Sequence, residues 1–295
     1  MPSRCQDIHG KMYHRHDQER YDAYINLAKE QALSGERVTM IAAGALLPHE
    51  ITQKVSRSNG ALNDVLGLQW LRIIQDVKDN GKLPNALAIC DVSGSMMGQP
   101  IQVSVALALL VSDITDGLFS NQVITFSERP EFIQLPKATV DNLSSRVAFM
   151  EGMDWGRNTN FQAVFDLIFE NARKENLEAD KMPSIIFCFS DMEFDEAHEG
   201  NWKTDLELVR AKYTKAGYEV PTIVFWNLDD TDSKPASFEE PGVVMLSGFS
   251  AGMLKAFLEF QLDSIPTPLE QMIQMLQYYN GLVLANEDKE TMQAN

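Results

Sequence analysis

The stretch "ALAICDVSGSMMGQP", residues 86–100, holds the pattern that decides the fold. A short apolar run stops at Asp91, and two serines, Ser93 and Ser95, follow at alternate positions. A continuous apolar run is typical of a strand buried on both faces, as in a parallel sheet. One carboxylate and two hydroxyls therefore follow the end of such a strand, where we expect Gly94 to permit a tight turn.

Apolar runs of the same kind recur along the chain, in "QVITFS", "EFIQL", "SIIFCFS", "TIVFWNL" and "VVMLSG". They alternate with stretches of helical periodicity, expected to form helices at 100–116, 140–150, 160–176, 203–217 and 252–260. This alternation predicts an α/β fold with three layers around a doubly wound, Rossmann-like and mostly parallel sheet. In the strand order 3-2-1-4-5-6, the first and fourth strands are neighbours, and a crevice opens at their carboxyl ends.

The first 85 residues have a different pattern, with several helical stretches and no strand. In "NDVLGLQWLRIIQDVKDNG" the apolar residues form one stripe, and Trp70 is expected to anchor this helix in a core. We therefore expect a helical segment at 1–85, either reduced or part of a larger helical module, before an α/β domain at 86–295. A C-terminal helix, marked by a capping box at Thr267 and Glu270, completes that domain.

Three segments of the chain are expected to meet at the crevice. Asp91 follows the first strand, Asp191 in "FSDMEF" follows the fourth, and Thr159 in "WGRNTNFQAVF" lies in a loop that opens a helix. The predicted ligand set is Asp91, Ser93, Ser95, Thr159 and Asp191. All its donors are oxygens and only two are charged, which suits a hard cation such as Mg²⁺; the absence of His and Cys disfavours zinc and copper.

The pattern Asp91-Val-Ser93-Gly-Ser95, with the Thr159 loop and Asp191, resembles the metal-ion-dependent adhesion site of von Willebrand factor A domains. The resemblance implies a bound Mg²⁺, with Mn²⁺ or Ca²⁺ as alternatives, and one coordination position left for an Asp or Glu of a protein partner. It also implies that Asp91, Ser93 and Ser95 are direct ligands, that Thr159 binds in the engaged site, and that Asp191 binds directly or through water.

The surroundings of this site predict where a partner would make contact. Six residues are expected to form the rim of the contact: Met96, Met97, Gln99, Arg157, Asn158 and Glu193. Arg157 could pair with the partner's carboxylate in a charge-assisted hydrogen bond. The expected function is therefore that of a metal-dependent adhesion or scaffold module.

A wider likeness extends beyond the metal site. Stretches such as "AAGALLPHE", "LQWLRIIQDV", "VITFSERP" and "PTIVFWNL" resemble a plant-type family that joins helices to an A domain. That family is distantly similar to the Ro (TROVE) proteins, which join a helical-repeat ring to an A domain. The alternative function is therefore a ribonucleoprotein component that binds RNA through helical parts, although 85 residues are too few for a full ring.

Composition limits the classes of partner. The chain has 42 Asp and Glu against 25 Lys and Arg, a net charge of −17, which disfavours nucleic acid as a partner. No apolar run reaches the roughly 18 residues of a membrane span, and the polar first twenty residues do not resemble a secretory signal. We expect a cytoplasmic protein, with the nucleus as the alternative location.

The sequence motifs also argue against an enzyme. "GSMMG" is not a nucleophile elbow, because the residue two positions before Ser95 is Ser93 rather than glycine. The chain has no Gly-Lys-Ser/Thr ending of a phosphate-binding loop. A phosphoaspartyl enzyme would need an acid at the position of Ser93. We therefore expect a binding protein.

Overall fold

The structure is a computed structural model of the 295-residue chain. It describes residues 3–57, 61–79, 81, 83–91, 93–125, 129–153, 161–192, 202–228 and 242–248. The chain divides into two units, residues 1–255 and 256–295, and every described residue belongs to the first. The helix expected at 252–260 and the capping box at Thr267 and Glu270 lie outside the described residues.

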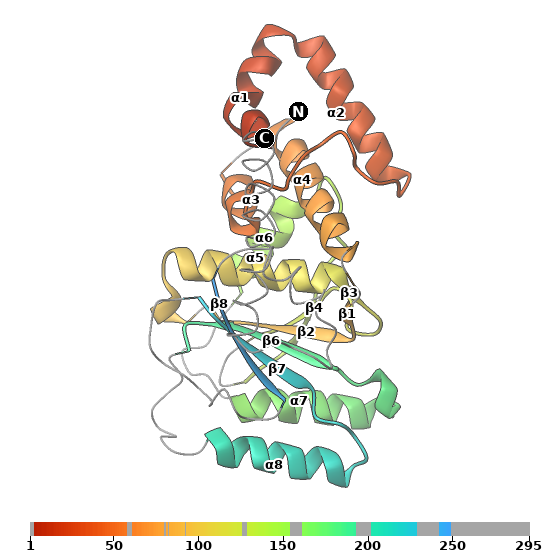
Figure 1. Ribbon diagram of the computed structural model, residues 1–295, viewed down its shortest axis with the longest axis vertical. Coiled ribbons are helices and arrows are strands. Elements are labelled where there is room, and N and C mark those ends of the chain that lie inside the picture. The colour runs from red at the N-terminus through yellow and green to blue at the C-terminus, as the bar shows by residue number, and fades with distance from the viewer. Residues whose placement is uncertain are drawn as a thin grey trace, which may run out of the picture. The chain divides into compact units, whose positions relative to one another are not determined.

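A six-stranded sheet carries the α/β part of the chain (Figure 1). Its strands are β2 (Ala86–Cys90), β4 (Gln122–Thr125), β5 (Phe132–Gln134), β6 (Ile185–Ser190), β7 (Thr222–Asn227) and β8 (Val243–Ser247). Their order is β5-β4-β2-β6-β7-β8, and every neighbouring pair is parallel except β4 and β5. This is the predicted order 3-2-1-4-5-6, so the expected fold class is confirmed. A separate pair of two-residue strands, β1 (Leu83–Pro84) and β3 (Thr115–Asp116), was not expected.

Helices cover both faces of the sheet, which is why its central strands are apolar throughout. Figure 1 shows α5 (Gln99–Ile114) on one side and both α7 (Phe161–Lys174) and α8 (Trp202–Lys215) on the other. Every residue of β2 and β6 is buried. The sheet and its two helical layers form the predicted three-layer arrangement.

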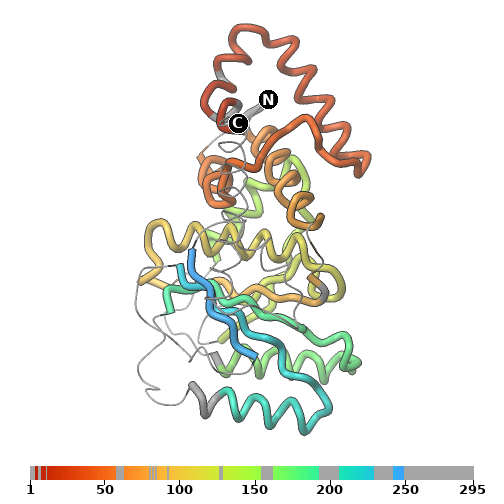
Figure 2. Tube along the Cα trace, in the orientation of Figure 1, coloured from red at the N-terminus to blue at the C-terminus, as the bar shows by residue number. Residues whose placement is uncertain are grey.

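Helix α5 is buried at every position from Val103 to Ile114, as its continuous apolar sequence predicts. The sheet contacts one side of α5, and the N-terminal helices α3 (Pro48–Val55) and α4 (Ala61–Lys78) contact another (Figure 2). An apolar surface all around a helix needs a partner on every side. The helical segment supplies the partner on the side away from the sheet.

The first helices add a smaller core of their own. Helices α1 (Ser3–His16) and α2 (Gln18–Leu33) contact each other and α4. The buried residues of this core are Tyr21, Ile25, Ala28, Val38, Ile41, Val65, Leu68 and Val140. Val140 comes from the connection before α6 (Leu143–Glu151), so this core also joins the helical segment to the α/β part. A Cβ added at Gly67 of α4 would overlap with the carbonyl oxygen of Val140, so glycine is needed for this close approach.

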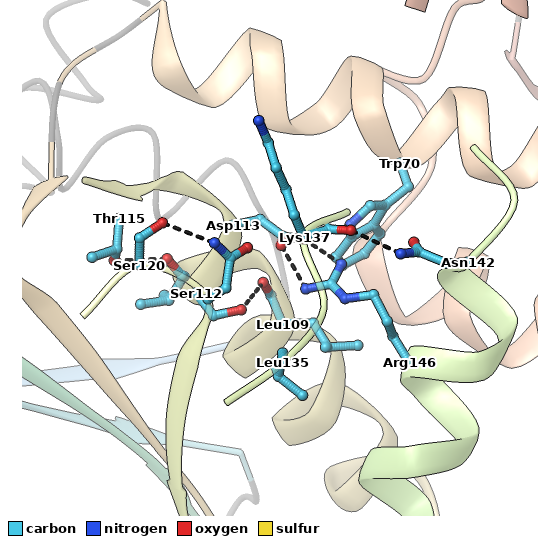
Figure 3. A network of polar contacts seen from close by, with 12 residues as sticks. Trp70, Leu109, Ser112, Asp113, Thr115, Ser120, Leu135, Lys137, Asn142 and Arg146 are labelled. Atoms are coloured by element: carbon cyan, nitrogen blue, oxygen red, sulfur yellow. Dashed lines mark hydrogen bonds and ion pairs between the residues drawn. The ribbon is translucent and has the colours of Figure 1, made fainter. Parts of the chain in front are cut away.

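A buried ion pair and a hydrogen bond to it connect three helices (Figure 3). The guanidinium of Arg146 on α6 donates two hydrogen bonds to the carboxylate of Asp113 on α5, at 2.9 and 2.5 Å. The indole N–H of Trp70 on α4 donates to the same carboxylate at 2.8 Å. Trp70 is fully buried, which confirms its expected role as an anchor, and Arg146 is only 1% exposed. The pair satisfies charges that would otherwise be costly to bury.

Candidate metal centre

The two acids expected at the crevice lie side by side at one edge of the sheet. Asp91 directly follows β2 and Asp191 directly follows β6, and these parallel strands are paired with Cys90 opposite Phe189. The winding of the sheet reverses between the same two strands. Both acids are buried, with exposures of 2% and 1%. The topology therefore brings together the two carboxylates that the sequence predicted to meet.

The carboxylate of Asp91 is held from two directions. Its Oδ1 accepts a hydrogen bond from the backbone N–H of Ser93 at 2.8 Å. Its Oδ2 accepts one from the hydroxyl of Ser190, the last residue of β6, at 2.5 Å. One bond fixes the loop to the acid and the other fixes the neighbouring strand to it, so this carboxylate has little freedom to rotate.

The two hydroxyls of the loop converge as the alternate spacing predicts. Ser93 Oγ and Ser95 Oγ lie 3.0 Å apart. Ser95 lies in the short 3₁₀ turn η1 (Gly94–Met96), and Ser93 directly precedes this turn. Ser93 is half-buried and Ser95 is exposed. Two neutral oxygens, one of them on an exposed residue, therefore lie together in the loop that follows the buried Asp91.

The turn depends on a different glycine from the one expected. Gly94 begins the 3₁₀ turn without a positive φ, and a Cβ added there would meet no atom within 4 Å. Gly98 has a φ of 105°, in the region that residues with side chains rarely adopt, and it directly precedes α5. The expectation for Gly94 is wrong, because the position that needs glycine is Gly98, where the loop joins the helix with a positive φ.

Burial dominates the electrostatics of the site. It raises the pKa of Asp91, and the charge of the nearby Asp191 raises it further. The hydrogen bonds from Ser190 and Ser93 act in the opposite direction, because they stabilise the carboxylate. Two neighbouring buried carboxylates repel each other, and a divalent cation between them would compensate both charges.

The expected rim is only partly described. Met97 is 82% exposed and Gln99 is exposed, as residues at a contact surface should be. Met96 is fully buried, so the expectation that it lines the rim is wrong. The 3₁₀ turn directs Met96 into the core, and the next residue, Met97, outward.

Four residues of the predicted site fall outside the described part of the chain. These are the ligand Thr159 and the rim residues Arg157, Asn158 and Glu193. Their part in the site stays a prediction.

Sequence reasoning missed Ser190. The pattern "SIIFCFS" predicts only that Ser190 ends a strand, yet its fully buried hydroxyl contacts the carboxylate of Asp91. The available signal was a polar residue at the last position of an otherwise apolar strand, directly before a candidate ligand. Within the described ranges, no group of three or more His, Cys, Asp or Glu side chains could hold a metal.

Comparison with known proteins gives the family. The chain belongs to the family described as "Domain of unknown function (DUF7788)", whose model matches residues 85–292. A second model, "Domain of unknown function (DUF2828)", matches residues 1–83.

A relative and two solved structures are similar to the chain. "Uncharacterized protein L728" of Acanthamoeba polyphaga mimivirus is 36% identical to this chain over 243 residues. The match covers 82% of this chain but only 41% of the viral protein's length. The Ro (RSR) protein of Deinococcus radiodurans has a TM-score of 0.48 at 16% identity, over 83% of this chain and 49% of its own. Proximal thread matrix protein 1 of the mussel byssus has a TM-score of 0.40 at 14% identity, over 61% and 46%. Structural likeness at this level carries no information on function.

No helix in the described part of the chain is long and apolar enough to cross a membrane.

Proposed function

We propose that this chain binds a divalent cation, Mg²⁺ or alternatively Mn²⁺ or Ca²⁺, and uses it to capture an acidic side chain of a protein partner. The proposed ligands are Asp91, Ser93, Ser95, Thr159 and Asp191. One observation carries the proposal: two buried carboxylates end adjacent parallel strands, and two hydroxyls 3.0 Å apart lie in the loop that follows one of them.

The donor chemistry fits such a cation. Mg²⁺ prefers oxygen ligands, needs few carboxylates and keeps several waters. The exposure of Ser95 leaves the hydroxyl side of the site open to solvent, where a water on the metal can be exchanged. A carboxylate from a partner is the natural replacement for that water, because it is a hard and negatively charged oxygen donor.

A binding function fits the two serines better than catalysis does. The hydroxyls of Ser93 and Ser95 lie 3.0 Å apart, and that of Ser93 also contacts the carboxylate of Asp91, so three side chains bring oxygen atoms together. The sequence around Ser95 is not that of a nucleophile elbow. The resemblance to adhesion sites supports the same function, since there the hydroxyls coordinate the metal.

The alternative, RNA binding through the helical segment, has weaker support. The first 85 residues contain 11 Lys and Arg against 10 Asp and Glu, so they are nearly neutral rather than basic. Several of these cations also form ion pairs with acids, in the pairs Arg4–Glu50, Lys29–Asp64, Arg37–Asp76 and Arg72–Asp76. An RNA-binding surface needs an excess of cations.

Calorimetric titration with Mg²⁺ and Mn²⁺ tests the proposal. The wild-type chain should bind one ion, Asp91→Ala should lose binding, and Asp180→Ala should keep it. Asp180 is a suitable control because it is an exposed acid that pairs with Lys181 and precedes β6, whereas the proposed site follows the carboxyl ends of β2 and β6. Absence of binding to the wild type, or equal binding by Asp91→Ala, would show that the proposed site is wrong.

The open coordination position has its own test. Bound Mn²⁺ speeds the relaxation of water protons through the waters that it holds. Adding sodium acetate as a minimal carboxylate should lower this effect, because acetate replaces a bound water. An unchanged effect at saturating acetate would contradict the proposed capture of an acidic side chain.

A further inference from the structure

We infer that Ser190 is a positioning residue of the metal centre, whose hydroxyl holds both acids in place for the ion without binding the ion itself. This inference rests on the proposed function. It concerns a residue that the resemblance to adhesion sites does not include.

The direction of the Ser190 hydroxyl is set by its contacts. The backbone N–H of Met192 donates to Ser190 Oγ at 3.1 Å, which occupies an acceptor site of the oxygen. The single hydroxyl proton then points to Asp91 Oδ2, 2.5 Å away. The distance to Asp191 Oδ1 is 3.5 Å, at the limit of a hydrogen bond, so Asp91 receives the proton.

The same oxygen therefore joins the two halves of the site. Through its proton it holds the carboxylate of Asp91, which follows the neighbouring strand. Through its lone pair it holds the turn on which Asp191 lies, since Met192 is the next residue and has a positive φ of 65°. Two acids that repel each other are thus kept at a set separation before any cation arrives.

The Ser190 contact also decides which lone pairs of Asp91 remain available. A carboxylate offers about four acceptor sites. Ser93 N–H takes one on Oδ1 and Ser190 takes one on Oδ2. The remaining sites keep a fixed direction, because the carboxylate is held at both oxygens.

The burial of Ser190 distinguishes a positioning residue from a metal ligand. Ser190 is 0% exposed, whereas Ser93 is half-buried and Ser95 is exposed. The oxygen of Ser190 is enclosed and already makes two hydrogen bonds, so it lacks the open side that a ligand needs. Partners that orient metal ligands typically change metal affinity by about 10- to 100-fold when they are removed.

Ser104 provides a matched control. It lies on α5 and is 0% exposed. Its hydroxyl donates to the carbonyl oxygen of Phe189 at 3.2 Å, and Phe189 directly precedes Ser190 on β6. Its other close contact is the thiol of Cys90. Ser104→Ala therefore removes a buried serine hydroxyl beside β6 without removing a hydrogen bond to either acid.

The test is Mn²⁺ affinity, measured by the electron paramagnetic resonance signal of the free ion. The full chain is compared with Ser190→Ala, Ser190→Cys, Ser190→Thr and Ser104→Ala, with folding checked by circular dichroism. We expect Ser190→Ala and Ser190→Cys to bind about 10- to 100-fold more weakly, since alanine has no donor and a thiol is a weak one. Ser190→Thr, which keeps the hydroxyl, should restore most of the affinity, and Ser104→Ala should leave it unchanged.

The outcomes separate this inference from the proposed function. If the wild type binds Mn²⁺ and Asp91→Ala does not, while Ser190→Ala and Ser190→Cys bind like the wild type, only the role of Ser190 is wrong. An equal loss of affinity in Ser104→Ala would also overturn it, because any buried hydroxyl would then matter. If the wild type binds no Mn²⁺, both the function and this inference fall. Should Ser190→Ala not fold, Ser190→Cys decides, since its side chain has nearly the same shape.

Discussion

Replacing Arg146 by methionine should destabilise the whole first unit of the chain. The side chain of Arg146 is fully buried and gives Asp113 two of its three hydrogen bonds; the third comes from Trp70. Arg146→Met would leave a buried carboxylate with one donor, and breaking a buried pair in this way costs about 3–5 kcal/mol. That is a large part of the roughly 5–15 kcal/mol that stabilises a typical domain.

Urea unfolding followed by circular dichroism gives the free energy of unfolding for this test. Arg20→Met is the control, because it makes the same chemical change at an ion pair with Asp17 in which the Arg20 side chain is 87% exposed, and such pairs contribute about 0–1 kcal/mol. The double variant Asp113→Leu/Arg146→Met should recover part of the loss, since no charge remains buried. A loss in Arg146→Met no larger than in Arg20→Met would refute the reasoning.

Two other predictions follow from packing and from burial. Gly67→Ala should lower the free energy of unfolding by about 1–3 kcal/mol, because the added methyl group would overlap with the backbone carbonyl of Val140. This loss should exceed the roughly 1 kcal/mol by which alanine favours a helix over glycine. Gly44→Ala, where the added methyl group has open space around it, is the control in the same urea assay. A stabilised Gly67→Ala would contradict the close approach. In native protein at pH 8, iodoacetamide should modify the half-buried Cys5 alone, because burial raises the pKa of Cys90 to about 12 and that of Cys188 well above its usual value. Mass spectrometry should find one adduct on the native chain and three after denaturation, and native labelling of Cys188 would oppose this assignment.

The sheet could be predicted from the sequence because its strands are buried on both faces. Continuous apolar runs such as "SIIFCFS" separated by helical stretches leave few topologies, and the strand order then placed Asp91 beside Asp191. The two-residue strands β1 and β3 are too short to show any periodicity. The local sequence pattern was sufficient to predict an element wherever that element was long and apolar.

Residues whose environment depends on distant parts of the chain were harder to predict. Arg146 in "LSSRVAFME" resembles an exposed helix residue, and its burial depends on Asp113, 33 positions away. An acid within the apolar helix α5 was the available hint of a buried pair. Ser190 was missed for the same reason, since its partner Asp91 lies 99 positions earlier in the chain.

The arrangement of the site's loop also depended on details that spacing does not give. Both Gly94 and Gly98 suit a turn, and only the way in which the 3₁₀ turn joins α5 decides which of them adopts a positive φ. The same turn buries Met96 and exposes Met97. Alternate spacing predicted that the hydroxyls of Ser93 and Ser95 converge, but not which neighbouring side chains face solvent.

Anomalous X-ray diffraction from crystals grown with Mn²⁺ tests the central claim most directly, because it locates the ion itself. The account predicts one strong peak at the carboxyl ends of β2 and β6, within about 2.0–2.3 Å of the hydroxyl oxygens of Ser93 and Ser95. The peak should disappear in Asp91→Ala crystals grown under the same conditions. A wild-type crystal with no peak at the strand ends, or with peaks only at exposed acids elsewhere, would contradict the claim that this chain holds a metal ion there.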